Sequence, residues 1–226
     1  MHDRWKIILI LFAALTFLLV PPRDSSAQQI PEWVNLTDLM YAARDGHYYL
    51  AKDLIRRGAS VNAETGRGYR ALMLAAMWGN LDVAKLLIGY GATVSATDKD
   101  GYTALVYACR YGHLDVAKLL VDNGADINHV TKDQKTALFL SSMMGHSDIV
   151  VYLLNRNAEV NISTKQGLTP LMQASRYAHE GIVQMLLQAG ADVNATNIRG
   201  QTAMDLARKN GLNEIVALLQ NGPGGS

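Results

Sequence analysis

The chain has 226 residues, of which 49% are hydrophobic and 18% charged, and this composition argues against intrinsic disorder. Its 21 basic and 20 acidic residues nearly cancel, so it lacks the basic excess that holds most proteins on nucleic acid. The single cysteine excludes an intrachain disulfide and any Cys-rich zinc or iron–sulfur framework.

Residues 1–27 have the pattern of a signal peptide. Two basic residues precede an apolar run over residues 7–20, and two prolines and three small residues follow it. As a helix this run spans about 21 Å at about 1.5 Å per residue, less than the ~30 Å hydrocarbon core of a bilayer. We therefore expect export and cleavage between Ala27 and Gln28, with an uncleaved membrane anchor as the alternative. Cleavage leaves 18 basic and 18 acidic residues.

An internal period of 33 residues runs through the rest of the chain. Its anchors, each 33 residues after the one before, are Leu39, Leu72, Leu105, Leu138, Leu171 and Met204. Seven residues after them come Gly46, Gly79, Gly112, Gly145, Ala178 and Gly211. Gapless recurrence over six copies predicts a repeat array. We assign residues 28–31 to a short linker and 222–226 to a flexible tail. The six units lie at about 32–64, 65–97, 98–130, 131–163, 164–196 and 197–221.

Each unit has the signals of two short helices. A threonine that can cap a helix precedes most anchors, and the glycine seven residues later can end that helix; the threonines are Thr103, Thr136, Thr169 and Thr202. A second segment such as 81–90 has apolar residues on one helical face, and a polar stretch such as 97–101 follows as a turn. A unit this small cannot bury its apolar face alone, so the units must stack.

These units resemble ankyrin repeats, as residues 100–105, 112–120 and 124–128 illustrate. Thr169-Pro170-Leu171 is nearest to the family's threonine-proline-leucine-histidine motif, but the histidine of that motif is replaced in five units, by Met73, Val106, Phe139, Met172 and Asp205. The replacement puts in doubt the hydrogen bonds that this histidine makes between repeats, though not the fold. The resemblance implies an all-α fold, an ankyrin-repeat α-solenoid of about six stacked helix-turn-helix units with hairpin tips. It also implies a protein that binds other proteins and is not an enzyme.

Two positions depart from the glycine pattern. Asn157 replaces a glycine at the end of a second helix, and asparagine tolerates the left-handed region. Ala178 tolerates it poorly, at a cost of about 1 kcal/mol. The fifth unit is therefore predicted to have either a lengthened first helix or a weak joint to its neighbour.

No catalytic or metal-binding pattern is present in the sequence. Four histidines recur eight residues after an anchor, at His47, His113, His146 and His179. Because stacked repeats lie about 10 Å apart, one metal cannot bind them together; we expect each to hydrogen-bond the adjoining turn. His129 is a lone turn residue to which we give no role, and Cys109 is expected in the core rather than as a reactive thiol. We predict no cofactor and no metal.

The candidate binding residues occupy three slots of the repeat. They lie three residues before, five after and six after the anchors, where the ankyrin resemblance implies a concave face of turn tips and first helices. The set is Tyr69, Met77, Trp78, Tyr102, Arg110, Tyr111, Met143, Met144, Arg176 and Tyr177. Met77 and Met143 have packing between repeats as their alternative role. Tyr, Trp and Arg are enriched in binding hot spots, and lysines at the tips (Lys99, Lys132, Lys165) favour an acid-leaning partner surface.

The sequence thus predicts an exported, monomeric adaptor or inhibitor that binds a protein partner and, once cleaved, neither nucleic acid nor membrane. A signal peptide on a disulfide-free ankyrin array resembles bacterial periplasmic proteins of this kind. That resemblance leaves three roles open: support of a haem catalase in peroxide defence, neutralisation of a toxin as an immunity protein, and action on host proteins as a secreted effector. A haem-handling factor with its own small-molecule site is the competing class.

Overall fold

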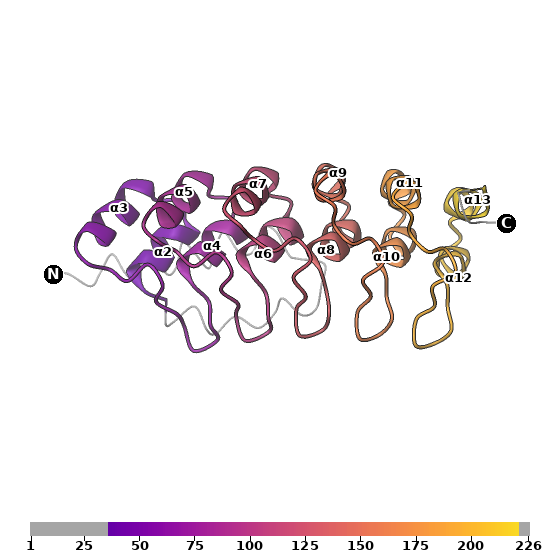
Figure 1. Ribbon diagram of the computed structural model, residues 1–226, viewed down its shortest axis with the longest axis horizontal. Coiled ribbons are helices and arrows are strands. Elements are labelled where there is room, and N and C mark those ends of the chain that lie inside the picture. The colour runs from indigo at the N-terminus through magenta and orange to yellow at the C-terminus, as the bar shows by residue number, and fades with distance from the viewer. Residues whose placement is uncertain (1–35, 222–226) are drawn as a thin grey trace. The chain divides into compact units, whose positions relative to one another are not determined.

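The computed structural model describes residues 36–221, so the predicted signal peptide, linker and tail lie outside the described residues. The described part forms twelve α-helices in six consecutive pairs, which we number as repeats one to six (Figure 1). The first helices are α2 (Asp38–Arg44), α4 (Ala71–Met77), α6 (Ala104–Tyr111), α8 (Ala137–Met144), α10 (Pro170–Arg176) and α12 (Ala203–Lys209). The second helices are α3 (Tyr48–Arg56), α5 (Leu81–Gly89), α7 (Leu114–Asp122), α9 (Ser147–Asn155), α11 (Glu180–Gln188) and α13 (Asn213–Asn221).

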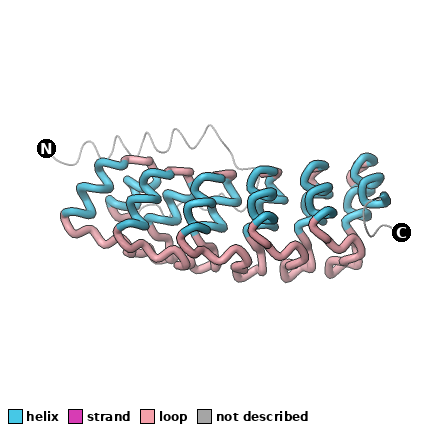
Figure 2. Tube along the Cα trace, turned by 45° about the horizontal axis from the view of Figure 1, so that its top comes forward, coloured by secondary structure: helices cyan, strands magenta, loops and turns pink. Residues whose placement is uncertain are grey.

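The helices stack in two layers. Each first helix packs against its own second helix and against the first helices of the neighbouring repeats, and the second helices form a parallel layer (Figures 1 and 2). The predicted all-α solenoid is confirmed. None of the helices between residues 36 and 221 has the length and apolar character needed to cross a bilayer.

The first helices begin where the threonines predict. The hydroxyl oxygens of Thr103, Thr136 and Thr169 accept hydrogen bonds from the backbone N–H three residues on, at 3.3, 3.0 and 3.2 Å. Thr202 forms a capping box with Asp205, whose carboxylate accepts the Thr202 N–H at 2.9 Å. These caps satisfy N–H groups that a helix start leaves without partners.

The core lies between the two layers and between successive repeats. The anchor Leu105, the small Ala108 three residues later and Leu120 from the second helix are at most 1% exposed. Alanine at the small slot lets neighbouring helices approach closely, and full burial of each leucine contributes about 1.5–3 kcal/mol. This repeated packing makes each unit depend on its neighbours for a core.

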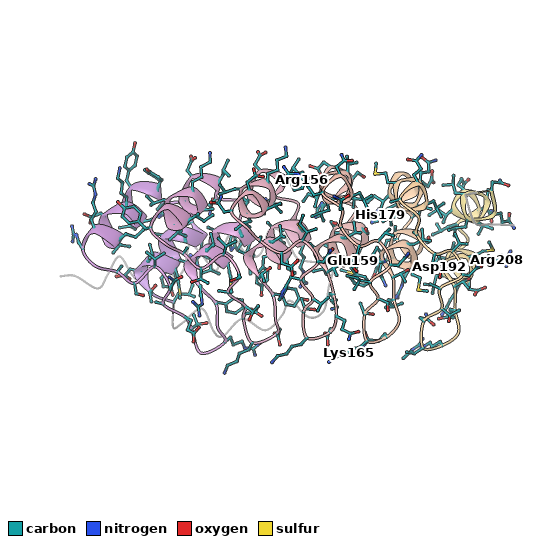
Figure 3. All side chains as sticks on the ribbon, viewed as in Figure 1. Arg156, Glu159, Lys165, His179, Asp192 and Arg208 are labelled. Atoms are coloured by element: carbon teal, nitrogen blue, oxygen red, sulfur yellow. The ribbon has the colours of Figure 1, made fainter. Side chains whose placement is uncertain are left out.

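The loops between repeats form five tight tips, at residues 65–69, 98–102, 131–135, 164–168 and 197–201. In each, the N–H of the first residue donates to the carbonyl of the fifth at 3.0 Å. Neighbouring tips are joined by one backbone hydrogen bond each, for example from the Lys99 N–H to the Arg67 carbonyl at 2.8 Å. Figure 3 shows Lys165 among the tips and Arg156 in the layer of second helices.

A histidine at each inner joint reaches back to the preceding repeat. The Nε2 atoms of His113, His146 and His179 lie 3.0, 3.1 and 3.2 Å from the carbonyls of Met77, Arg110 and Met143. These carbonyls can only accept, so each Nε2 carries the proton. The predicted bonding to the adjoining turn is confirmed for these three. Hydrogen bonds between repeats are therefore present without the histidine of the family tetrapeptide.

The turn glycines make room for these rings. Gly112 has φ +84°, and a Cβ there would lie 2.7 Å from Cε1 of His146. Glycine is thus required both by the left-handed backbone and by the approach of the next repeat.

The joint between the fifth and sixth repeats differs. Ala178 has φ +62°, and α10 has seven residues, as do α4 and α12, so the predicted lengthening of the fifth unit's first helix is wrong. Leu212 stands where the inner joints have histidine. The Arg176 carbonyl instead accepts a hydrogen bond from Asn210 Nδ2 at 3.2 Å. Because no histidine ring approaches Ala178 from the next repeat, there is space for the alanine Cβ.

One further histidine has a structural contact that the sequence did not predict. His129 Nε2 lies 2.8 Å from the carbonyl of Gly101, at the tip of its own repeat. A loop histidine thus braces a tip, and that contact corrects the expectation that it has no role.

Candidate binding surface

Four large side chains, one per repeat, are exposed at the ends of consecutive first helices. Trp78 and Tyr177 follow the last residues of α4 and α10, and Tyr111 and Met144 end α6 and α8. Their exposed fractions are 45% for Trp78, 37% for Tyr111, 44% for Met144 and 49% for Tyr177. The predicted exposure of Trp78, Tyr111 and Tyr177 is confirmed. We call these four residues the exposed row.

Arginines accompany two members of the exposed row. The guanidinium carbons of Arg110 and Arg176 each lie 5.6 Å from the ring centre of the following tyrosine, Tyr111 or Tyr177. This is within the range of a cation–π interaction. The stacking fixes positive charge beside the aromatic faces, in the third and fifth repeats.

The methionines five residues after an anchor are half-buried rather than exposed. Met77 ends α4, and Met143 packs against the buried Phe139 and Leu140 together with Tyr102 and Leu168. Phe139 occupies the slot of the missing family histidine and is 2% exposed. Packing, the alternative role for Met143, is therefore part of what it does.

Two predicted contact residues, Tyr69 and Tyr102, are half-buried around a third tyrosine. Their ring centres lie 6.2 and 5.2 Å from that of Tyr107 in α6. Burial raises the pKa of both phenols; for Tyr69 a hydrogen bond with Tyr107 partly offsets the effect. These tyrosines therefore stay neutral at physiological pH, and only part of each ring is exposed to solvent.

Asp98 holds this tyrosine cluster in place. Asp98 is 6% exposed, and its carboxylate accepts a hydrogen bond from the Tyr107 hydroxyl. Its Oδ1 also accepts the backbone N–H groups of Asp100 and Tyr102, both at 2.9 Å. Burial is the largest cause that raises the Tyr107 pKa, followed by Tyr69 and Asp98. The second and third repeats thus share a preorganised polar link beneath the surface.

Asp98 and Tyr107 are absent from the sequence prediction, although a signal for them exists. Most tips begin with threonine, and the slot of Tyr107 is leucine in the second and fourth repeats. In the third repeat, Asp98 and Tyr107 therefore both depart from the residues that the other repeats favour. An acidic and a phenolic departure within one repeat indicate that the two side chains interact.

The tips carry both signs of charge. Lys99, Lys132 and Lys165 are exposed, but Asp100 and Asp133 follow the first two, and Lys135 Nζ lies 4.0 Å from Asp133. Positive charge at the tips is therefore weaker than the lysines alone suggest, and Arg110 and Arg176 contribute the charge next to the exposed row.

Residues 36–221 hold no cluster of potential metal ligands, and the cysteine among them is buried. Within residues 36–221 no three His, Cys, Asp or Glu side chains are grouped so as to hold a metal ion. Cys109 is fully buried, and burial raises the pKa of its thiol, which disfavours the thiolate. Its placement in the core is as predicted.

Comparison with known families agrees with this geometry. The chain matches the family of ankyrin repeats (three copies) over residues 39–131 and 126–197. It belongs to the ankyrin repeat family. A search of curated proteins finds no match. An ankyrin array is a scaffold that typically binds proteins rather than catalyses a reaction, so the face of tips and first helices is the candidate site. Which residues of that face contact a partner stays a prediction.

Proposed function

We propose that this protein is an exported protein-binding module, an adaptor or inhibitor, that engages its partner through the face formed by the tips and the first helices. The observation that carries the proposal is the exposed row, in which a single slot presents a large apolar side chain in four successive repeats. Scattered exposed apolar residues are ordinary on protein surfaces, whereas an aligned set indicates an interaction site.

The chemistry of the row fits a binding hot spot. Tryptophan, tyrosine and arginine are the residues whose truncation most often costs about 2 kcal/mol or more of binding free energy. Methionine adapts to irregular partner surfaces. Arg110 and Arg176 favour a partner surface rich in carboxylates, because charge complementarity speeds association and fixes register.

Export is the second part of the proposal. It rests on the basic start, apolar run and small residues of the first 27 positions. The mature N-terminus, read by mass spectrometry from a native host, should begin at Gln28. Recovery of intact Met1 from a membrane pellet would support the anchored alternative.

Affinity capture from the native envelope tests the binding role. Tagged wild-type protein should retain a specific partner, and the double variant Trp78→Ala/Tyr111→Ala should lose it while its circular dichroism stays unchanged. Recovery of a catalase, a toxin or a host protein would decide among the three roles. Equal capture by the double variant would contradict the proposed site and move it to another face.

A further inference from the structure

The distance between neighbouring side chains of the exposed row limits which partner segments can contact all of them. Stacked helices lie about 8–10 Å apart, so the same slot recurs at about that interval from repeat to repeat. The row has one large exposed side chain per repeat: Trp78, Tyr111, Met144 and Tyr177 in successive repeats. A partner segment that meets all four must present a side chain at each interval.

An extended chain meets this interval with every third residue. A polyproline II helix rises about 3.1 Å per residue with three residues per turn, so one turn covers about 9.3 Å and places every third side chain on one face. An α-helix rises only about 1.5 Å per residue, so it needs six or seven residues per repeat. It would also be about 10–12 Å across, wider than a single file of side chains.

The surface offers aromatic side chains rather than a strand edge. Residues 36–221 contain no β-strand, so in this region a bound peptide has no sheet to extend. Aromatic-lined surfaces instead recognise polyproline II segments, whose backbone needs no hydrogen-bonding partner from the receptor.

We propose that the row binds an extended, acidic segment of the partner in a polyproline II-type conformation. The segment is about ten residues long, carries proline or another apolar residue at every third position, and has carboxylates between them. Arg110 and Arg176, each stacked on a tyrosine of the row, receive those carboxylates. This inference rests on the proposed function and adds the conformation and side-chain spacing of the ligand.

A random 16-residue peptide library displayed on phage is the probe. It is selected on the full-length protein and counter-selected on Trp78→Ala/Tyr111→Ala. The enriched peptides should have apolar residues or prolines at intervals of three, with Asp and Glu over-represented between them. A synthetic peptide of the enriched sequence should bind Met144→Ala at least tenfold more weakly than wild type. Tyr49→Ala, which removes an exposed tyrosine from the second-helix layer, should bind within twofold of wild type.

An interval of six or seven residues would show a helical ligand and overturn the inference, as would enrichment without periodicity or no enrichment. If capture of the native partner still depends on Trp78 and Tyr111, such a result leaves the proposed function standing. If native capture is indifferent to the row, the proposed function itself fails.

Discussion

The joint between the third and fourth repeats and the joint between the fifth and sixth are built differently. In the first, Gly112 leaves space for the ring of His146, which hydrogen-bonds the Arg110 carbonyl at 3.1 Å. In the second, Ala178 fills the space of the glycine, and the shorter Asn210 side chain hydrogen-bonds the preceding repeat at 3.2 Å. At this last joint the chain omits the glycine and the histidine together, whereas the joint between the first and second repeats keeps Gly46 and has Asn80 in place of the histidine.

The exposed row occupies other slots of the repeat than these glycines and histidines. Its four side chains are 37–49% exposed, whereas the glycines and histidines lie between repeats. One ring contact joins the two sets, between Tyr177 and His179, whose ring centres lie 6.5 Å apart. If the proposed function holds, the array's stability and its binding depend on different slots of the same repeat, so substitutions should separate them.

Gly112→Ala should produce the largest loss of stability. The left-handed backbone disfavours a Cβ, and that Cβ would overlap His146, so we expect a loss of about 2–3 kcal/mol in unfolding free energy. Urea denaturation followed by circular dichroism measures it.

Gly124→Ala is the matched control, because Gly124 has φ +85° and an added Cβ would meet no atom of a neighbouring repeat within 4 Å. It should cost only about 1 kcal/mol. Adding His146→Ala to Gly112→Ala should cost less than the sum of the two single changes. If the two losses in unfolding free energy were strictly additive, Gly112 and His146 would act independently, and the two joints would not differ in the way described.

Tyr107→Phe should have the next largest effect, at the joint that carries an additional link. It removes the donor to the buried Asp98 carboxylate, which we expect to cost about 1–2 kcal/mol. The same change should cost less in an Asp98→Asn background, because the charged group that needs the donor is then absent. Asparagine fits the turn at this position, since Asn197 already begins the tip of the sixth repeat. Equal losses in both backgrounds would show that the carboxylate is not the group that needs the phenol.

Ala178→Gly should stabilise the array by about 0.5–1 kcal/mol, because glycine adopts φ +62° without strain. The melting temperature reports the gain. Asn157→Gly, at φ +61°, should gain less, since asparagine tolerates this region. An unchanged or lower melting temperature for Ala178→Gly would mean that the last joint is not strained.

The smallest expected effect is a pH dependence at the joint between the second and third repeats. Burial lowers the pKa of His113. The hydrogen bond to the Met77 backbone raises this pKa and so opposes the effect, whereas the charge of His146 lowers it further. Below about pH 6.5 the unfolded chain therefore takes up the proton first, and stability falls as the pH falls.

Thermal unfolding between pH 7.5 and 5.5 tests this dependence. His113→Asn should reduce it while keeping the joint, because Asn80 already donates to the Ala43 and Arg44 carbonyls at the preceding joint. An identical pH dependence in the variant would assign it to other groups.

Most of the fold was predictable because it repeats. The period located the anchors, the caps and the turn glycines, since each reflects a local rule that recurs in every unit. For the fifth unit the sequence predicted either a lengthened first helix or a weak joint. The lengthening is wrong, because Ala178 adopts φ +62° without any extension of α10, and the weak joint stays a prediction. Three turn glycines, Gly79, Gly112 and Gly145, each face a histidine of the next repeat that lies 34 positions further along the chain. Only the stacked structure shows this pairing.

The candidate site was predictable in part. Exposure of Trp78 and Tyr177 follows from their place just before a turn. The burial of Tyr69 and Tyr102 against Tyr107 does not, because it depends on side chains from two repeats and a carboxylate from a tip. The position of a residue within the repeat predicts which face of the array it lies on. How deeply its side chain is buried depends on the neighbouring side chains.

Titration of the captured partner into wild-type and variant arrays tests the central claim most directly. Trp78→Ala/Tyr111→Ala should lose about 2 kcal/mol or more of binding free energy per residue, which is about 30-fold for each, with an unchanged melting temperature. Tyr49→Ala/Tyr90→Ala removes two tyrosines that lie outside the row and are more exposed than Trp78 and Tyr111. This variant should bind within about twofold of wild type. Full affinity of the row variant, or an equal loss in the control, would contradict the claim that the exposed row is the binding site.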